Sequence, residues 1–581
     1  MKNLIPLLAW LALVGGGNAP TEHSTEGIRA ELVTEVIDTP VPAGDTLALT
    51  RELLRRSAAA TDSNPEPRTL QQCDASRGAV CFPRTGLHFR CGSGRPCDHA
   101  GRLPDLIAFA TQAATERPDA GFIMGFAVYS MVRQGNVGVA SDLVSECRSQ
   151  EWWCSALEGY VLHASGDQIA ADDRFRSALT MAPDSVRCEF VQPNRVLVGG
   201  HRRTLDRAEC TERNAAADTI WWLSDPLYAS ETNDRFTEHL ARTLEARLQI
   251  ILDHNHGANN RRRFTHDHIP DWYHELLWDL YVPRGYPDSW RRRDRMTPTP
   301  YELWTSRPAA RYHFVPDFEG EGFGNPTWRL EAELADEGYT PSYGTFHEVP
   351  TQVARFRNGD AMQVAVAGTV TGSGMRGTGE PHLILTDAPG SFPVREVAEP
   401  DGPESRFLTE IPFERHVLSH EVLGDREFGR FRVMLEPLAH EGAGLSDLLL
   451  YHPDDDVPPH EVQPAATRML PGTRIEPGHE VGVYWESYGV TPDAPIHLDI
   501  SLEGQARGGI LGTLRRLLPG GGPATPVRLG WSETADGDTH TSAVTLDLSE
   551  LDPGSYTLVL EAEWDGSDGP VETRRVVRVG S

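Results

Sequence analysis

The sequence predicts a multidomain α+β protein in which an N-terminal all-α helical repeat region precedes two C-terminal antiparallel β-sandwich modules. The first observation is a helical periodicity of apolar residues between about residues 104 and 252. The second is a change, from about residue 353, to short alternating strands separated by clusters of Gly, Pro and Asp. The third is a length of 581 residues, which exceeds what one hydrophobic core normally supports.

The first residues have the order of a secretory signal. Lys2 precedes the apolar run 4–14, and small residues lead to Ala19. The run is shorter than the roughly 20 residues that span a bilayer, so we expect a signal peptide at 1–19; the alternative is a buried N-terminal helix. No later stretch approaches that length, which predicts no integral membrane segment after signal removal.

Residues 20–67 are rich in Thr, Pro, Ser and acidic side chains, which predicts a disordered tether. Within the tether, residues 45–60 carry a leucine pattern that indicates a transient or docked helix, with Leu49 and Leu53 among its apolar positions.

The charge balance excludes several classes of partner and enzyme. A net charge of -30 argues against nucleic acid or an anionic membrane surface as the main partner. Lys2 is the only lysine, so P-loop, kinase, Schiff-base and Ser-Lys chemistry all lack their lysine. We therefore expect no cofactor and predict a protein or peptide as the partner.

All eight cysteines lie between Cys73 and Cys210. An even number of cysteines in an exported protein predicts disulfides, and eight allow 105 pairings, so the connectivity stays open. Zinc requires closely spaced ligand pairs, which the spacings of 8, 10 and 6 within the Cys-rich loop segment 68–103 do not supply. The predicted disulfide residues are Cys73, Cys81, Cys91, Cys97, Cys147, Cys154, Cys188 and Cys210.

The helical region contains an internal repeat. From Gly159, small or aromatic residues follow at offsets of 12, 16 and 19, and a proline follows at 24. They are Ala171, Phe175, Ala178 and Pro183. These offsets resemble the tetratricopeptide repeat, and a degenerate copy has its turn at Gly135, 31 residues before the turn at Gly166. Gly159 and Ala171 are expected to let two helices approach closely, with Phe175 filling the next gap. The alternative is an unrelated helical bundle.

Downstream, an amphipathic helix is expected after Asn233, because apolar residues recur every four positions. They are Phe236, Leu240, Leu244, Leu248 and Leu252. The run 221–228 forms an apolar docking strip before it, and a second helix is expected from about Pro270. Residues 255–263 are predicted to be a polar loop.

A family resemblance rests on these residues. The run Trp221–Tyr228, the following 233–235 and 237–239, and the later 280–290 look like the central region of exported bacterial proteins related to the GWxTD-domain family. The name-giving motif itself is absent, since residues 285–290 match it only loosely. The resemblance implies an envelope protein and transfers no catalytic residue.

The C-terminal half alternates between apolar and polar residues in short runs. Strands are expected at 353–357, 362–367, 382–385, 428–433, 480–488, 496–502, 542–548 and 556–562. An acidic, proline-rich linker at 453–464 is expected to separate the two modules. The phrase Leu551–Leu558 resembles the turn into a late strand of immunoglobulin-like modules, with Tyr556 packed at the corner.

One histidine-rich loop, 253–274, is dense enough in imidazole and carboxylate groups to suggest a transition metal. Its candidate metal ligands are His254, His256, His266, His268 and His274. It lacks the HExxH pattern, and no GxSxG is present anywhere, so we assign no catalytic residue and read the loop as solvated.

Two functions therefore stay open. The first is a non-enzymatic, periplasmic or extracellular interaction or scaffold protein of the cell envelope. The alternative is a secreted hydrolase, with or without metal assistance, whose site lies near loop 253–274. The expected divisions after the tether are a Cys-rich segment at 68–103, a tetratricopeptide-like region at 104–215, a helical middle region at 216–330, and β-sandwiches at 331–452 and 465–581.

Overall fold

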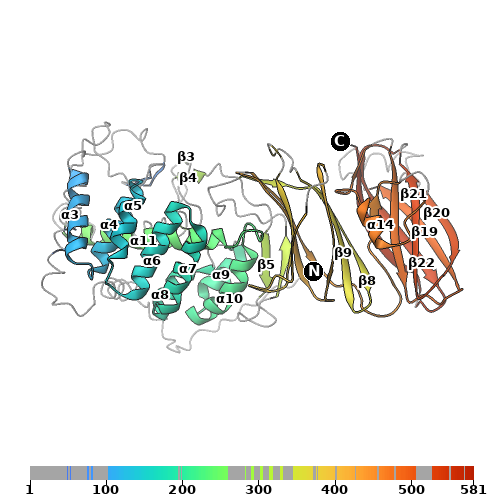
Figure 1. The fold of residues 1–581 in the computed structure, drawn as a ribbon, viewed down its shortest axis with the longest axis horizontal. Helices are drawn as coiled ribbons and strands as arrows, with labels where there is room; N and C mark the ends of the chain where they lie inside the picture. Colours follow the sequence, from blue (N-terminus) through green and yellow to red (C-terminus); the bar gives the residue numbers. More distant parts are fainter. Residues whose placement is uncertain are drawn as a thin grey trace, which may run out of the picture.

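The computed structural model describes residues 102–259 and 345–580 with short gaps, and outside these ranges only short strands and a few single residues. The gaps fall at 194–196, 198, 371–374, 376, 378, 399–401, 426, 454–456, 477–478, 505–526, 549–550 and 568. Helices occupy one end of the molecule and β-sheets the other (Figure 1), which confirms the predicted α+β class. The expected signal peptide and second helix from Pro270 lie outside the described residues.

The helical half is a row of helices in which most pack on the next one along the chain. Its members are α3 (Arg102–Glu116), α4 (Gly121–Arg133), α5 (Val137–Ser145), α6 (Glu151–Ser165), α7 (Gln168–Met181), α8 (Asp184–Val191), α9 (Gly199–Arg207) and α10 (Cys210–Leu223). Leu53, from the expected tether, is helical and fully buried in this core, so the disordered tether does not extend over it.

The residues that predicted close helix packing perform that role. A Cβ atom added at Gly159 of α6 would lie 3.0 Å from the ring of Phe175 on α7, so any other residue would require the ring to move by a few tenths of an ångström. The turn before α7 uses Gly166 in the left-handed conformation (φ 91°), and the Asp167 side chain accepts the backbone N–H of Ala170 at 3.1 Å. Sequence pattern and packing therefore agree across the α6–α7 pair.

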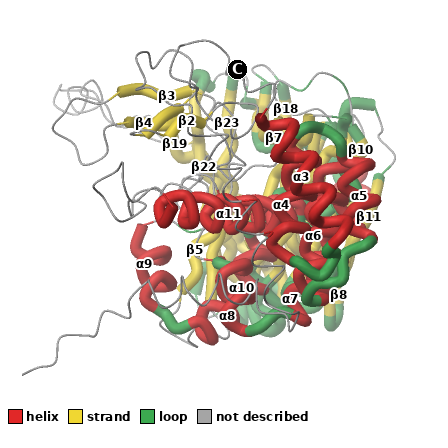
Figure 2. Tube along the Cα trace, turned by 90° about the vertical axis from the view of Figure 1, so that its left-hand side faces the viewer, coloured by secondary structure: helices red, strands yellow, loops and turns green. Residues whose placement is uncertain are grey.

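Helix α11 (Asp234–Asn259) runs along the row and packs on α4, α6, α7 and α8 (Figures 1 and 2). Asn233 caps it, because its side-chain oxygen accepts the backbone N–H of Phe236 at 3.0 Å. The buried surface of α11 is broader than the predicted apolar pattern, because Arg242, Thr243 and Arg247 are nearly as buried as the leucines. The predicted polar loop 255–263 was wrong at its start, because residues 255–259 continue the helix.

Two disulfides crosslink the helical half. Cys147 and Cys154 join the end of α5 to α6, and Cys188 of α8 joins Cys210 of α10. Cys81 lies in a short hairpin of β1 (Ala75–Arg77) and β2 (Val80–Phe82). The predicted pairing partners Cys73, Cys91 and Cys97 lie outside the described residues.

Breaking these crosslinks is expected to affect one half of the protein only. The Cys188→Ser/Cys210→Ser variant should lower the free energy of unfolding of the helical half by about 2–4 kcal/mol, because its unfolded chain loses a constraint over 22 residues. Residues 345–580 contain no cysteine and should be unaffected. Hydrogen exchange read by mass spectrometry with and without reductant measures both halves at once, and equal loss in both would contradict this expectation.

Residues 289–331 correct the expected helical middle region. Their described parts are strands: β3 (Ser289–Arg292) pairs with β4 (Tyr301–Trp304), and β5 (His313–Asp317) pairs with β6 (Thr327–Glu331). No helical periodicity was assigned to these residues; they were grouped with the expected helices that precede them.

The first β module consists of two sheets packed face to face. One has the order β12-β9-β8 and the other β11-β10-β13-β14-β7, and their inward side chains share one core that includes Val364, Leu383 and Leu418. The strands are β7 (Thr345–Glu348), β8 (Thr351–Asn358), β9 (Ala361–Thr369), β10 (Glu380–Thr386), β11 (Val394–Val397), β12 (Glu404–Ile411), β13 (His416–Leu423) and β14 (Glu427–Leu435). All four strands predicted for this module are present.

The second β module also contains two sheets. In one sheet, β18 pairs with β15, β16 and β21. The other sheet has the order β17-β23-β22-β19-β20. The strands are β15 (Gly444–Leu445), β16 (Leu449–Tyr451), β17 (Arg474–Ile475), β18 (Glu480–Tyr488), β19 (Pro495–Gly504), β20 (Val527–Thr534), β21 (Thr539–Asp547), β22 (Gly554–Trp564) and β23 (Val571–Val579).

The boundary between the two β modules lies earlier than expected. β15 and β16 precede the expected boundary at 452, yet both pair with β18 of the second module. The expected linker 453–464 leads directly into helix α14 (Val462–Thr467), which packs on β12 and β16. Gln352 joins the modules by donating to the carbonyls of Leu450 (3.0 Å) and Leu470 (2.9 Å). The two modules are therefore also joined by a packed interface.

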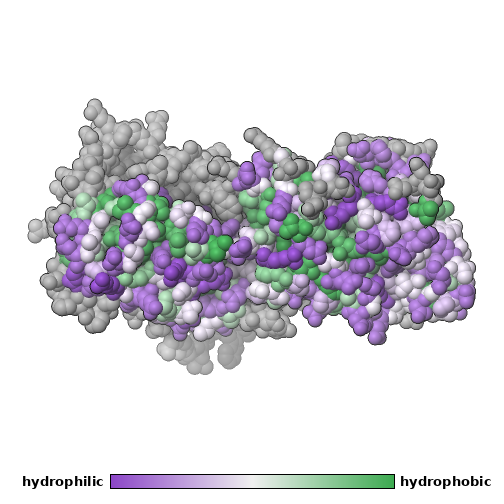
Figure 3. All heavy atoms as spheres, in the orientation of Figure 1, coloured by the Kyte–Doolittle hydropathy of each residue, from purple (hydrophilic) through white to green (hydrophobic). Residues whose placement is uncertain are grey.

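The surface shown in Figure 3 carries hydrophobic residues in small separate groups among hydrophilic ones. The large hydrophobic side chains exposed in the described ranges are distributed over α5, α7, β11, β20, β23 and the segment before α14; they are Val139, Ile169, Met181, Val397, Val457, Leu529 and Val576. None of the helices in these ranges combines the length and apolar composition that crossing a bilayer requires.

Candidate functional site

A cleft of about 1060 Å³ lies where the helical half meets the first β module. We call it the junction cleft. Its walls come from α7, α8, α10, the segment 230–236 and the connection between β10 and β11. The lining residues used below are Asp172, Arg176, Thr180, Asp184, Arg187, Asn214, Asp218, Trp221, Trp222, Asp225, Glu231, Phe236, Phe392 and Arg395.

Helical spacing explains why α10 supplies so much of the wall. Asn214, Asp218 and Trp221 follow one another at intervals of four and three residues, and Trp222 comes four residues after Asp218, which places them along one face of the helix. The tryptophans are anchored at the base of this face: the Trp221 indole N–H donates to the Val191 carbonyl at 3.0 Å. The α10 wall therefore has a fixed aromatic base with polar side chains above it.

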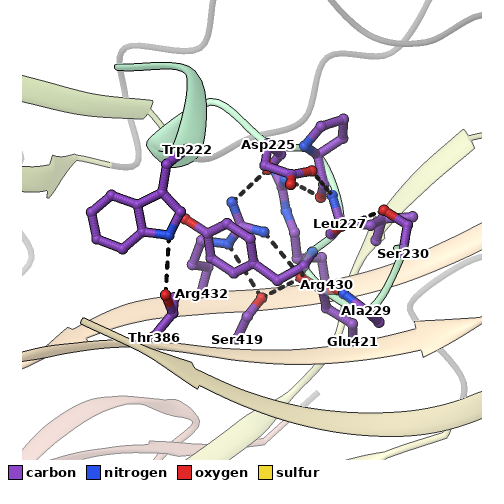
Figure 4. Close-up of polar contacts among 12 residues, drawn as sticks. Trp222, Asp225, Leu227, Ala229, Ser230, Thr386, Ser419, Glu421, Arg430 and Arg432 are labelled. Atoms are coloured by element: carbon purple, nitrogen blue, oxygen red, sulfur yellow. Dashed lines mark hydrogen bonds and ion pairs between the residues drawn. The ribbon is translucent and has the colours of Figure 1, made fainter. Parts of the chain in front are cut away.

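Two lining residues of the cleft, Trp222 and Asp225, belong to a buried polar junction that lies beneath it, between the helical half and the sheet of β10, β13 and β14 (Figure 4). The guanidinium of Arg432 donates to the Asp225 carbonyl at 2.7 Å and forms an ion pair with Glu421 at 3.0 Å. Glu421 also accepts the backbone N–H groups of Tyr228 (3.1 Å) and Ala229 (2.8 Å). The segment 221–228, predicted to be an apolar docking strip, therefore contacts the sheet, and it does so through charged side chains of the sheet as well as through apolar contacts.

Two neighbouring bonds complete this junction. The indole N–H of Trp222 donates to the Thr386 hydroxyl at 3.1 Å, and Arg430 donates to the Pro226 carbonyl at 2.7 Å. Burial raises the pKa of Asp225 well above its usual range, despite the opposing charge of Arg432. The α10–α11 connection is thus held on the sheet from several directions, which gives the cleft a rigid base.

Among the described residues, some charged side chains on the walls have a charged or aromatic partner and others have none. Arg176 pairs with Asp172 at 2.5 Å and lies over the Phe236 ring, Arg187 pairs with Asp184, and Arg395 lies 4.3 Å from the Phe392 ring centre. By contrast, the exposed carboxylates of Asp218 and Glu231 have no ion pair or hydrogen bond within the described part of the chain. The wall therefore presents negative charge to a ligand.

Buried acceptors add to this imbalance. Oδ1 of Asp172 and Oδ1 of Asn214 are both shielded from water and have no hydrogen-bond donor among the described residues. Both residues line the junction cleft, on α7 and α10. Both oxygens are therefore acceptors without a described donor in a part of the wall that lies below the cleft surface.

Buried titratable groups elsewhere are sealed inside the protein. Ser405 and His420 form a hydrogen bond of 3.0 Å that resembles a nucleophile and base, but they are 2% and 0% exposed. Burial lowers the pKa of His420 to about 4. In the helical half, burial alone would raise the pKa of Glu238, yet Arg242 and His163 hold it far below its usual range. Ser405 and His420 therefore offer no access to a substrate, whereas the partly exposed Glu238 is already paired with Arg242.

The predicted histidine site is not assembled in the described residues. His254 and His256 lie in the last turns of α11, in a part whose side chains are not described, so they belong to a helix and not to the expected loop. His266, His268 and His274 lie outside the described residues. Where side chains are described, no three His, Cys, Asp or Glu residues come together in a way that could hold a metal ion.

The comparisons with known proteins assign no family. No protein-family model matches the chain, and no curated protein matches it. Similar solved structures include red sea bream transglutaminase (11% identity, 40% of this chain, 31% of that chain, TM-score 0.15). Another is Salmonella alpha-2-macroglobulin reacted with methylamine (12% identity, 47% of this chain, 15% of that chain, TM-score 0.15).

A third is a family 123 glycoside hydrolase from Clostridium perfringens (10% identity, 23% of this chain, 27% of that chain, TM-score 0.13). The chain spans less than a third of the length of each of these three structures. At such TM-scores the likenesses carry no argument about this protein, so its function has to be argued from its own geometry.

Proposed function

We propose that this protein is an exported, periplasmic or extracellular interaction or scaffold protein that binds a partner polypeptide in the junction cleft. The observation that carries the proposal is the cleft itself. Its volume of about 1060 Å³ is at the upper end of what ligand sites usually have, and its lining mixes aromatic and polar groups. A site of this size accommodates several residues of a peptide.

Rigidity supports a binding role. The Cys188–Cys210 disulfide ties α8 to α10, which form two of the walls, and the Glu421–Arg432 ion pair fixes the junction beneath the cleft. A preformed site loses less conformational entropy when a partner binds. The disulfides also support export, because structural disulfides persist in oxidising compartments.

The proposed modules are a tetratricopeptide-like helical row and two immunoglobulin-like sandwiches. The Gly159–Phe175 packing supports the first. The hydroxyl of Tyr556, which donates to the Asp552 carbonyl at 2.7 Å, supports the second. In this arrangement α11 already covers the face of the row formed by α4, α6 and α7, so a partner is expected in the junction cleft and not on that face.

A cleft-filling substitution tests the proposal. Thr180 is an exposed lining residue on α7, whereas Ser177 is exposed on the same helix but does not line the cleft. Peptides selected on the intact protein from a random displayed library are expected to bind the Thr180→Trp variant about tenfold or more weakly. The matched Ser177→Trp variant should keep full affinity, and both should keep the parent melting temperature.

Isothermal titration with the selected peptides measures the difference. If the selected peptides bound Thr180→Trp as tightly as the parent protein, the junction cleft would not be the binding site.

A further inference from the structure

We infer that His540 is a pH-sensitive latch, which closes the corner between strands β20 and β21 while its imidazole is protonated and releases the corner when the proton is lost. The corner consists of residues 535–538 and lies in the second β module, at the end of the molecule away from the helices (Figure 1). The inference therefore goes beyond the proposed function and is independent of the junction cleft. It is carried by the position of the corner and by two carboxylates that contact the imidazole.

The corner joins the two sheets of this module. β20 is the edge strand of one sheet, where it pairs with β19, and β21 belongs to the other sheet, where it pairs with β18. The corner is also bonded to the turn 489–494, which connects β18 to β19. The Ala535 N–H donates to the Ala494 carbonyl at 2.9 Å, and the Asp493 N–H donates to the Ala535 carbonyl at 3.0 Å. Loosening of the corner therefore affects both connections at this end of the sandwich.

The imidazole of His540 lies between two carboxylates. Its Nε2 atom is 2.8 Å from Glu533 on β20, and its Nδ1 atom is 2.9 Å from Asp536 in the corner. Ionised carboxylates only accept hydrogen bonds, and a neutral imidazole has one N–H, whereas the imidazolium has two. Both contacts are therefore hydrogen bonds only when each ring nitrogen carries a proton. After loss of one proton, a nitrogen lone pair would face a carboxylate oxygen.

The two carboxylates are not held equally firmly. Glu533 also accepts the indole N–H of Trp531 and the hydroxyl of Ser542, both at 2.7 Å. The side chain of Asp536, by contrast, is 73% exposed in a turn. We therefore expect the single N–H of neutral His540 to stay on Glu533, so that loss of the proton releases Asp536 and the corner.

The charged groups that face His540 come from β20, the corner and the segment before α14. The first two supply the carboxylates. The hydrogen bond from His540, with a smaller contribution from the exposed His460 of the third, lowers the pKa of Asp536. On β18, the residue opposite His540 is the uncharged Ser487, and the carboxylate of its neighbour Glu486 is bound by two tyrosine hydroxyls. Among the described residues, His540 is thus the cation in contact with both carboxylates.

The pH range of the latch follows from the pKa shifts. The hydrogen bond to Glu533, supported by Asp536, raises the pKa of His540 above its usual range, although burial opposes it. Because the folded protein holds this proton more tightly than the unfolded chain, the latch stabilises the corner below the usual pKa of histidine. Its contribution is lost as the pH rises through the raised pKa. At the acid end, the bond to His540 lowers the pKa of Glu533 to about 2, so this carboxylate stays ionised throughout that range.

Two exposed aspartates of the same turn provide the test. Asp536→Asn keeps the shape of the side chain, but its amide can donate to an unprotonated ring nitrogen as well as accept from an N–H, so the corner should stay closed at either charge of His540. Asp538→Asn removes the same charge from a side chain that has no hydrogen bond or ion pair among the described residues. Both variants are compared with the parent as intact proteins.

Amide exchange of residues 535–540, read by mass spectrometry from about pH 5 to about pH 9, measures the closing of the corner once the intrinsic pH dependence of exchange is subtracted. Exchange at the C2 position of the His540 imidazole gives the pKa in the same samples. The parent should lose about threefold or more of the protection of the corner as His540 loses its proton. Strands β22 and β23 should keep their protection.

Asp538→Asn should show the same loss as the parent, and Asp536→Asn should show little or none. A corner whose protection is constant through the titration of His540 would overturn the inference, as would an Asp536→Asn variant that responds like the parent. Loss of the response in both variants would also overturn it, because the net charge of the turn and not the contact with the imidazole would then control the corner.

Discussion

Replacing Arg432 by methionine is expected to lower the free energy of unfolding of the junction by about 3–5 kcal/mol. The guanidinium is 2% exposed, and its partner Glu421 is fully buried, so the variant leaves a carboxylate in the interior without its counter-ion. The carbonyl of Asp225 also loses its donor, and the ring of Tyr228 loses the cation that lies 3.7 Å from its centre. Methionine replaces much of the apolar stem, so the loss is mainly electrostatic.

Hydrogen exchange of the segment 225–231 measures this loss, because the amides of Tyr228 and Ala229 donate to Glu421. Arg415→Met is the matched control: its ion pair with Glu436 is 3.1 Å long but about half exposed on both sides, so its loss should cost less than about 1 kcal/mol. In the Glu421→Gln/Arg432→Met double variant, part of the stability should return, since no uncompensated charge remains. Equal losses from Arg432→Met and Arg415→Met would show that the junction is solvated.

The same junction explains what the sequence could not predict. β13 carries both inward residues of the first sandwich and residues that face the helical half, and seven of its eight side chains are buried. Alternation of apolar and polar residues indicates a strand that has one face in the core and the other exposed to solvent. The inward face of β13 carries His420 beside Leu418, and its second buried face carries Val417 beside Ser419 and Glu421. The alternation is therefore broken on both faces, and neither the strand nor the ion pair was predicted.

Helix α11 and strand β18 were predicted better because their sequence signals are local. The spacing from Phe236 to Leu248 and the cap at Asn233 placed α11 correctly, and the alternation at 480–488 matched β18 to the residue. The end of α11 was missed because Asn255 and Gly257 favour loops, and this preference was overridden in the folded chain. The junction cleft has no local signal, since its walls are brought together only by tertiary packing.

The second large effect is expected in the core that holds α11. Trp153→Ala should lower the free energy of unfolding of the helical half by about 3–5 kcal/mol, because the ring is 1% exposed and its loss leaves a cavity. Its indole N–H donates to the Gly121 carbonyl at 2.7 Å, and a Cβ at Gly125 would lie 2.6 Å from the ring. Leu248 of α11 approaches the same glycine, so the cavity would open where α4, α6 and α11 meet.

A graded series separates packing from hydrogen bonding. Trp153→Phe keeps most of the ring and should cost only roughly 1–2 kcal/mol, from the lost N–H donor and the smaller side chain. Ile169→Ala, at a position 51% exposed on α7, should change stability by less than about 0.5 kcal/mol. Hydrogen exchange resolved by helix tells which elements respond. Joint loss of protection in α4, α6 and α11 is expected because they share this core; if α11 stayed protected in Trp153→Ala, contacts other than those around Trp153 would hold it on the row.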